Sequence, residues 1–188
     1  MTTFLYLLII IFGTSSYIVG IRQMLKGQYS PSTFSRVIWV LLSVNSFAGL
    51  VLSNSSNSST LLGLIFLLGN IVICITSFWK GTKEIGKLEY FCLGLLFLSV
   101  LIWFLFEAPL INLTISLLAH FIGGVPTYKK VWLNPKSESV GFWSLFFVAS
   151  LLSIFAANTY SLKTIIFPIY FTIFDGSMFL LALRDKRA

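Results

Sequence analysis

Long apolar runs alternate with short polar segments along the whole chain. An α-helix rises about 1.5 Å per residue, so about 20 apolar residues are needed to cross the hydrocarbon core of a bilayer. Seven runs come near that length. They cover residues 4–21, 34–52, 61–79, 90–106, 110–128, 140–157 and 164–183. The pattern therefore predicts an all-α integral membrane protein with seven transmembrane helices.

The composition favours a single membrane domain over residues 1–188. Hydrophobic residues make up 57% of the 188 residues and charged residues 10%, and the mean hydropathy is +0.93. Soluble domains of this size do not have such a composition. The first run has no basic segment before it and no small-residue cleavage site after it, so we expect a retained helix. Cys74 and Cys92 lie inside apolar runs without metal-ligand spacing, and we expect reduced, buried thiols.

The basic residues predict the orientation. Twelve of the thirteen Lys and Arg residues fall at the first, third and fifth connections or in the C-terminal tail, which share one side if the helices alternate in direction. These twelve are Arg22, Lys26, Arg36, Lys80, Lys83, Lys87, Lys129, Lys130, Lys136, Arg184, Lys186 and Arg187. Cytoplasmic loops are rich in Lys and Arg, so we expect the N-terminus outside and the C-terminus in the cytoplasm. The expected location is the cell (inner) membrane. Charge spread over four short segments argues against nucleic-acid binding. Lys163 and the tract at residues 53–60, which we interpret as a polar turn, fall on the opposite side.

The chain contains an internal duplication at an offset of 104 residues. The matches that composition explains least are Gly20 with Gly124, Lys26 with Lys130, Pro31 with Pro135, Ser35 with Ser139, Trp39 with Trp143, Ser46 with Ser150 and Asn54 with Asn158. Two repeats of three helices would run in opposite directions unless one extra helix separated them. We therefore predict a 3+1+3 arrangement of parallel three-helix bundles. Residues 1–83 form the first repeat, 84–107 an inverting linker helix on the outside, and 108–188 the second repeat.

Short loop motifs accompany the duplication. They are Pro126-Thr127 and Lys136-Ser137-Glu138-Ser139 in the second half, and Arg22-Gln23 and Ser30-Pro31-Ser32 in the first. This combination resembles the PQ-loop superfamily, which includes the SWEET (MtN3/saliva-type) sugar transporters, lysosomal amino-acid exporters and the KDEL-receptor fold. The chain also resembles small bacterial membrane proteins with this loop pattern, for which no substrate is implied. The Pro is kept in one half and the Gln in the other, so neither half has the complete pair. The resemblance implies the 3+1+3 fold and transport of a small polar solute.

Two ionisable side chains lie near the middle of predicted spans, His120 in the fifth and Asp175 in the seventh. An ionisable group at that depth is costly unless it faces the interior of the bundle, so both are candidate functional residues. Asn70 corresponds to Asp175 in the first repeat after a one-residue gap. The resemblance to SWEET proteins implies that this pair faces a central cavity and binds polar groups of the substrate. Ser16, which corresponds to His120, and Asn45 are candidates behind them.

The second repeat has an acid, Asp175, where the first has an amide, Asn70. Unlike an amide, an acid can carry a proton or pair with a cation. We expect Asp175, together with His120, either to couple transport to protons or to bind a cationic substrate. The alternative is a structural hydrogen bond between Asp175 and His120 that joins the fifth and seventh helices.

Aromatic and helix-breaking residues supply the remaining candidates. The resemblance implies that Trp39 and Trp143 stack against a sugar ring, whereas their shallow depth favours anchoring at the membrane interface. The other aromatic residues, chiefly Phe, we interpret as lipid-facing. Pro126 interrupts a helix beside Gly123 and Gly124, which predicts a hinge, with close helix packing as the alternative.

The predicted function is a carrier that moves a small polar solute, such as a sugar or an amino acid, by alternating access around a midplane site. The alternative is a ligand-binding receptor or scaffold of the same fold without transport. An enzyme is not expected, because the chain has one His and lacks a Ser-His-Asp arrangement, an HExxH motif, a carboxylate pair and a phosphate loop. No metal or cofactor is implied. The identity of the solute, coupling to protons and the association of two copies are left open.

Overall fold

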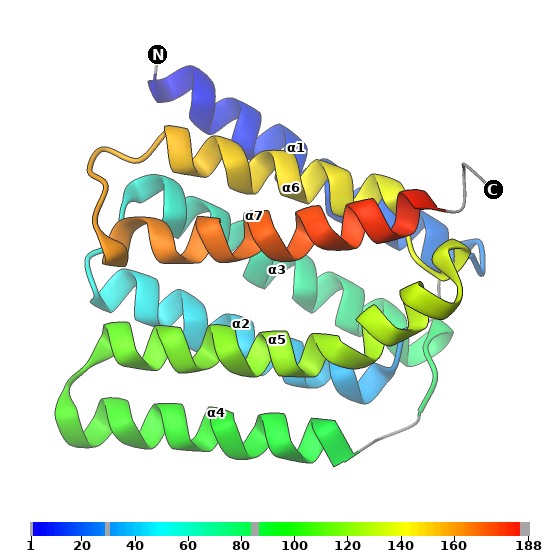
Figure 1. The fold of residues 1–188 in the computed structure, drawn as a ribbon, viewed down its shortest axis with the longest axis horizontal. Helices are drawn as coiled ribbons and strands as arrows, with labels where there is room; N and C mark the ends of the chain where they lie inside the picture. The colour runs from blue at the N-terminus through cyan, green and yellow to red at the C-terminus, as the bar shows by residue number, and fades with distance from the viewer. Residues whose placement is uncertain (1, 29–30, 84–86, 185–188) are drawn as a thin grey trace.

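The protein is built from helices joined by short connections. The structure, a computed structural model, describes residues 2–28, 31–83 and 87–184. The helices are α1 (Thr2–Leu25), α2 (Thr33–Leu52), α3 (Asn57–Lys80), α4 (Lys87–Phe106), α5 (Pro109–Leu133), the short 3-10 helix η1 (Pro135–Ser137), α6 (Val140–Phe155) and α7 (Leu162–Leu183). The long helices lie side by side, and α1 starts at the end of the bundle opposite to that where α7 finishes (Figure 1). The all-α prediction is confirmed.

The helices have the character of a multi-pass membrane protein. Within the described ranges, α1, α2, α3, α5 and α7 are long and apolar enough to cross a membrane, while Tyr90–Phe106 of α4 and Val140–Phe155 are shorter apolar helices. Large apolar side chains cover the outer surface, and Phe104 of α4 is 83% exposed. Exposed apolar area on this scale marks a surface that contacts something other than water. A lipid bilayer satisfies that requirement.

Four helices begin directly after a serine N-cap. The N-cap serines of α2, α3 and α6 accept a hydrogen bond from the backbone N–H three residues on, and α7 starts with a Ser-Thr capping box. These caps are Ser32, Ser56, Ser139 and Ser161. Each occupies a backbone donor that a helix start leaves without a partner. Because of its cap, α3 begins four residues before the predicted run at 61–79. The interpretation of residues 53–60 as a turn is wrong for Asn57 to Thr60, which form the first turn of α3.

Helices from the two halves of the chain lie against each other. α1 packs against α3 and α6, and α2 packs against α3 and α5. α7 packs against α6 and α5, and α4 lies at one edge of the bundle against α5 and α2, as expected for the fourth run (Figure 1). The N-terminal and C-terminal halves therefore meet at two main interfaces, α1 with α6 and α2 with α5.

The two ends of the bundle differ chemically. The α1–α2, α3–α4 and α5–α6 connections lie at the end where α7 finishes (Figure 1), and we call this the basic end because Lys26, Lys83 and Lys136 belong to these connections. The opposite end, which we call the serine end, holds the tract at residues 53–60. Lys186 and Arg187 lie outside the described residues. Which end faces the cytoplasm stays a prediction.

Candidate functional site

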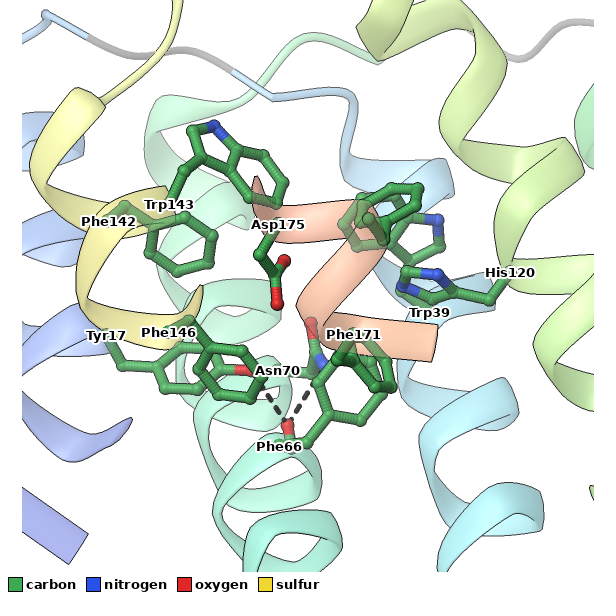
Figure 2. A pocket seen from close by; sticks show the side chains of 11 residues that line it. Tyr17, Trp39, Phe66, Asn70, His120, Phe142, Trp143, Phe146, Phe171 and Asp175 are labelled. Carbon is green, nitrogen blue, oxygen red and sulfur yellow. Dashed lines mark hydrogen bonds between the residues drawn. The ribbon is translucent and has the colours of Figure 1, made fainter. Parts of the chain in front are cut away.

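A small pocket lies between all of the long helices except α4. Eleven side chains line it (Figure 2): Tyr17 of α1, Trp39 of α2, Phe66 and Asn70 of α3, His120 of α5, Phe142, Trp143 and Phe146 of α6, and Phe171, Phe174 and Asp175 of α7. Both halves of the chain therefore contribute to its wall.

The pocket brings together five of the residues that the sequence singles out. Trp39, Asn70, His120, Trp143 and Asp175 all line it, and none is more than 5% exposed. They come from five different helices and are separated by up to 136 residues in sequence. Their convergence agrees with the expectation that polar groups at membrane depth face the interior.

Asp175 is the acidic group of this pocket. Its side chain projects from α7 into the space between Trp143 and Asn70 (Figure 2). Its Oδ2 atom is buried and has no hydrogen-bond partner among the described residues. An ionised carboxylate in an apolar environment is unstable unless it is paired. The carboxyl group is therefore stable either in its protonated form or beside a cation.

Asn70 and Tyr17 are held by one backbone carbonyl. The Asn70 Nδ2 atom donates to the Phe66 carbonyl oxygen at 2.9 Å, and the Tyr17 hydroxyl donates to the same oxygen at 3.3 Å (Figure 2). The Tyr17 ring lies directly on α3 at Gly69, where a Cβ atom would come within 2.3 Å of the ring. A glycine at this position thus allows α1 to present Tyr17 to the pocket.

His120 is fixed by a tyrosine and by aromatic rings. Its Nδ1 atom lies 2.8 Å from the Tyr170 hydroxyl, with which it shares a hydrogen bond. Its ring centroid lies 4.7 Å from that of Trp39 and 4.9 Å from that of Phe174. The Nε2 atom is buried without a hydrogen-bond partner in the described part of the chain. The alternative of an Asp175–His120 hydrogen bond is wrong for this conformation, because the nitrogen that forms a bond is paired with Tyr170.

Phenylalanine side chains form most of the apolar wall. Phe66, Phe142, Phe146, Phe171 and Phe174 line the pocket and are at most 9% exposed. The interpretation of Phe as lipid-facing is wrong for these five residues. Hydropathy does not separate a ring that faces lipid from a ring that faces a cavity, because both environments are apolar.

A sequence signal for part of this wall exists. Phe66 lies four residues before Asn70, and Phe171 lies four residues before Asp175. Residues four apart share a helix face, so an aromatic ring accompanies the polar group on both helices. The two rings touch, with centroids 4.5 Å apart.

The tryptophans lie inside the bundle. The Trp143 Nε1 atom donates to Glu138 at 3.3 Å, whereas Trp39 Nε1 is buried without a partner in the described ranges. Trp143 is 2% exposed and Trp39 5%. Interfacial anchoring is therefore the wrong interpretation, and both rings form pocket walls.

Charged groups gather around Glu138 at the basic end. Its Oε1 atom forms an ion pair with Lys130 Nζ at 2.6 Å. Arg36 of α2 is also buried, interacts electrostatically with Glu138 and stacks on the Trp39 ring, with its Cζ atom 4.5 Å from the ring centroid. An acid from the second half thus attracts a base from the first half beside the pocket.

Hydroxyl groups close the serine end. Ser56 and Ser59 donate to the Thr164 carbonyl oxygen at 3.1 and 2.5 Å, and Ser58 donates to the Ser153 carbonyl oxygen at 2.9 Å. These bonds join the start of α3 to α6 and α7. The pocket between the two closed ends has room for about one water molecule. In this conformation it does not accommodate a sugar or an amino acid.

Two predicted site residues lie elsewhere. Ser16 is buried between α1 and α6, where its hydroxyl donates to the Phe142 carbonyl oxygen at 2.8 Å. Asn45 belongs to a buried polar cluster with Ser99, Asn112 and Ser116 at the junction of α2, α4 and α5. Neither lines the pocket, since each finds its partners in a helix interface.

The predicted hinge residues are closely packed. α5 continues through Pro126 and bends towards its C-terminal end (Figure 1). A Cβ atom on Gly124 would lie 2.7 Å from the Phe174 ring, and one on Gly123 would lie 3.2 Å from the Cys92 sulfur. The alternative of close packing accounts for both glycines, and the hinge stays a prediction.

The chain matches no family model, no curated protein and no solved structure. The site is therefore interpreted from its own geometry.

Proposed function

We propose that the chain is a membrane carrier that moves a small polar solute by alternating access, with the 3+1+3 architecture of SWEET-like transporters. The observation that carries the proposal is the pocket around Asp175. It lies between both halves of the chain, contains a buried carboxyl group whose Oδ2 atom has no partner among the described residues, and lies between two separate sets of contacts at the two ends of the bundle. A site of this kind suits a protein that opens to one side at a time.

The packing supports the proposed duplication. In two bundles related by a pseudo-twofold axis, a contact between different helices of the two bundles occurs twice, and a contact between equivalent helices lies at the axis. α1 with α6 and α2 with α5 form the first type of contact. Phe66 of α3 and Phe171 of α7 form the second type, with ring centroids 4.5 Å apart.

Under this proposal, opening the serine end or the basic end costs only a modest amount of free energy. Hydrogen bonds between membrane helices contribute about 0.6 kcal/mol each, so the three serine-end bonds described above contribute about 2 kcal/mol. At the basic end, the described contact between the two halves is the electrostatic interaction of Arg36 with Glu138, and the ion pair and hydrogen bond of Glu138 with Lys130 and Trp143 stay within the second half. Differences of this size leave a minor open state populated, and a solute that binds it better shifts the equilibrium.

Asp175 is the proposed point of competition between solute and proton. A proton neutralises the carboxyl group in the closed, empty pocket, and it leaves when a solute group takes its place. The titratable and charged side chains around Asp175 are Tyr17 of α1, Arg36 of α2, His120 and Tyr128 of α5, and Tyr170 of α7. His120 is the other proton acceptor that lines the pocket, so it provides the comparison variant.

Flux in proteoliposomes tests the proposal. Purified protein is reconstituted with an internal pH-sensitive dye and exposed to a panel of sugars, amino acids and amines. We expect saturable movement of at least one solute in exchange for protons, which move in the opposite direction. Asp175→Asn should lower the solute-driven proton movement by at least about tenfold, because an amide cannot release a proton, whereas His120→Gln should retain the proton dependence.

The control is Glu107→Gln, which removes an acidic charge from an exposed position between α4 and α5 and should leave flux unchanged. Circular dichroism and gel filtration check that each variant folds. Solutes that bind without ever crossing the membrane contradict the carrier proposal and favour a receptor. Unchanged proton dependence in Asp175→Asn contradicts the coupling.

A further inference from the structure

We infer that the solute of this pocket is a small methylated ammonium cation, held by aromatic faces and by the Asp175 carboxylate. This inference rests on the proposed function, since it names the substrate class of the same site. It starts from the lining residues, which combine one acid, no Lys or Arg and mostly aromatic rings.

The charge of the pocket excludes anionic groups. Asp175 is the one lining residue with a carboxyl group, and no lining residue carries a guanidinium or an ammonium group. A carboxylate or phosphate on the solute would face Asp175, while the buried Arg36 stacks behind Trp39 and already interacts with Glu138. Such a group is strongly disfavoured in an apolar site. Zwitterionic amino acids and sugar phosphates therefore fit poorly, while a cation neutralises the buried acid.

The hydrogen-bonding capacity of the pocket is too small for a sugar. Asn70 Nδ2 donates one of its two hydrogens and the Tyr17 hydroxyl its only one to the Phe66 carbonyl oxygen. The buried side-chain atoms left without a partner among the described lining residues are Asp175 Oδ2, His120 Nε2 and Trp39 Nε1. A sugar carries several hydroxyl groups, and most of them would be left without partners at a substantial cost. A methylated ammonium group needs few or no hydrogen-bond acceptors.

The aromatic rings supply what such a cation does need. Phe142 and Trp143 meet at 86° with centroids 4.8 Å apart, and Phe171 lies on the other side of the Asp175 carboxyl group (Figure 2). Rings set at right angles present faces and edges around one point, as the walls of an aromatic cage do. A cation over an aromatic face is attracted by the ring quadrupole, most strongly over Trp and in a desolvated site.

The pocket also limits the size of the cation. It holds about one water molecule when closed, so binding requires the halves to separate around the solute. The substituents on the nitrogen therefore have to be small. Methyl groups meet this limit and also contact the rings directly.

Binding to the detergent-solubilised full chain tests the inference without any variant. The probes are choline, tetramethylammonium and the neutral isostere of choline, in which a carbon replaces the quaternary nitrogen, with sodium chloride as the salt control. By isothermal titration calorimetry, we expect choline to bind at least about 30-fold more tightly than its isostere, since shape and apolar area are equal and only the charge differs. Equal affinities, or no binding of either cation, would overturn the inference.

Variants then locate the binding site. Asp175→Asn should weaken choline binding by at least about tenfold, and so should Trp143→Leu, which keeps the site apolar but removes the aromatic face. Phe97→Leu, on the exposed surface of α4, is the matched control and should bind as the original chain does. Choline binding that survives both pocket substitutions places the cation elsewhere and contradicts the inference.

Flux separates this inference from the carrier proposal. Choline that binds with the expected preference but does not cross proteoliposomes supports the cation site and contradicts transport. A sugar or an anionic solute that crosses, with no preference for choline over its isostere, supports transport and contradicts the cation site.

Discussion

The polar cluster around Asn45 gives the sharpest test of how α4 is attached to the bundle. Asn45 Nδ2 lies within hydrogen-bond distance of Ser99 Oγ and Asn112 Oδ1, at 2.9 Å each, and of Ser116 Oγ. Asn112 Nδ2 donates back to Asn45 Oδ1 at 3.1 Å. All four residues are buried. Asn45→Leu keeps the size and branching of the side chain and removes every one of these bonds.

The magnitude follows from the number of hydrogens. An amide nitrogen has two, so Asn45 makes the equivalent of two donated bonds and one accepted bond. At about 0.6 kcal/mol per bond in a membrane protein, its loss should cost about 2 kcal/mol of unfolding free energy. Asn112→Leu leaves both Asn45 hydrogens with Ser99 and Ser116 and removes the bond that Asn112 donates, so it should cost about 0.6 kcal/mol. The double variant loses the same bonds as Asn45→Leu alone, so the coupling energy should also be about 0.6 kcal/mol.

Reversible unfolding in mixed detergent and SDS micelles, followed by circular dichroism, measures these free energies. The matched control is Thr114→Val on α5, whose exposed hydroxyl bonds only to its own helix at Leu110, and it should change stability by less than about 0.5 kcal/mol. The reasoning is refuted if the costs of Asn45→Leu and Asn112→Leu add in the double variant, because reciprocal bonds cannot be lost twice.

Two further predictions concern the closed ends and the helix contacts. Glu138→Gln removes the charge that attracts Arg36 of the first half, so buried Cys74 of α3 should react several-fold faster with a thiol reagent; an unchanged rate would contradict the role of Glu138. Gly69→Ala should destabilise the fold by about 1–3 kcal/mol, because its Cβ atom would come within 2.3 Å of the Tyr17 ring. Gly94→Ala, which meets nothing within 4 Å, is the control, and equal melting temperatures for the two variants would refute the packing argument.

Apolar runs located the helices because a bilayer imposes one strong constraint on every span. They did not give the helix ends. Those are set by hydrogen bonds such as that of Ser56 at the start of α3, and hydropathy does not register a serine cap. A polar tract next to an apolar run therefore looks like a loop even where it forms the first turn of a helix.

Polar residues in predicted spans were a useful but incomplete guide to the pocket. Asp175, His120 and Asn70 all line it, because an ionisable or amide group at that depth has to face the interior. Asn45 met the same criterion and lies elsewhere, since Asn112 satisfies it. Whether two polar side chains are partners depends on which helices touch, and a single sequence does not contain that information.

Asn70 and Asp175 occupy corresponding positions in the proposed duplication but differ in charge, and this difference determines which solutes the pocket can bind. Each follows a phenylalanine by four residues on its helix, and both line a pocket with room for about one water molecule. Two aspartates there would repel each other, so that one would have to stay protonated. Two asparagines would leave the aromatic walls without a charge to balance a cation. One acid opposite one amide provides a single negative site in an apolar surrounding, which is the electrostatic condition for holding one monovalent cation at a time.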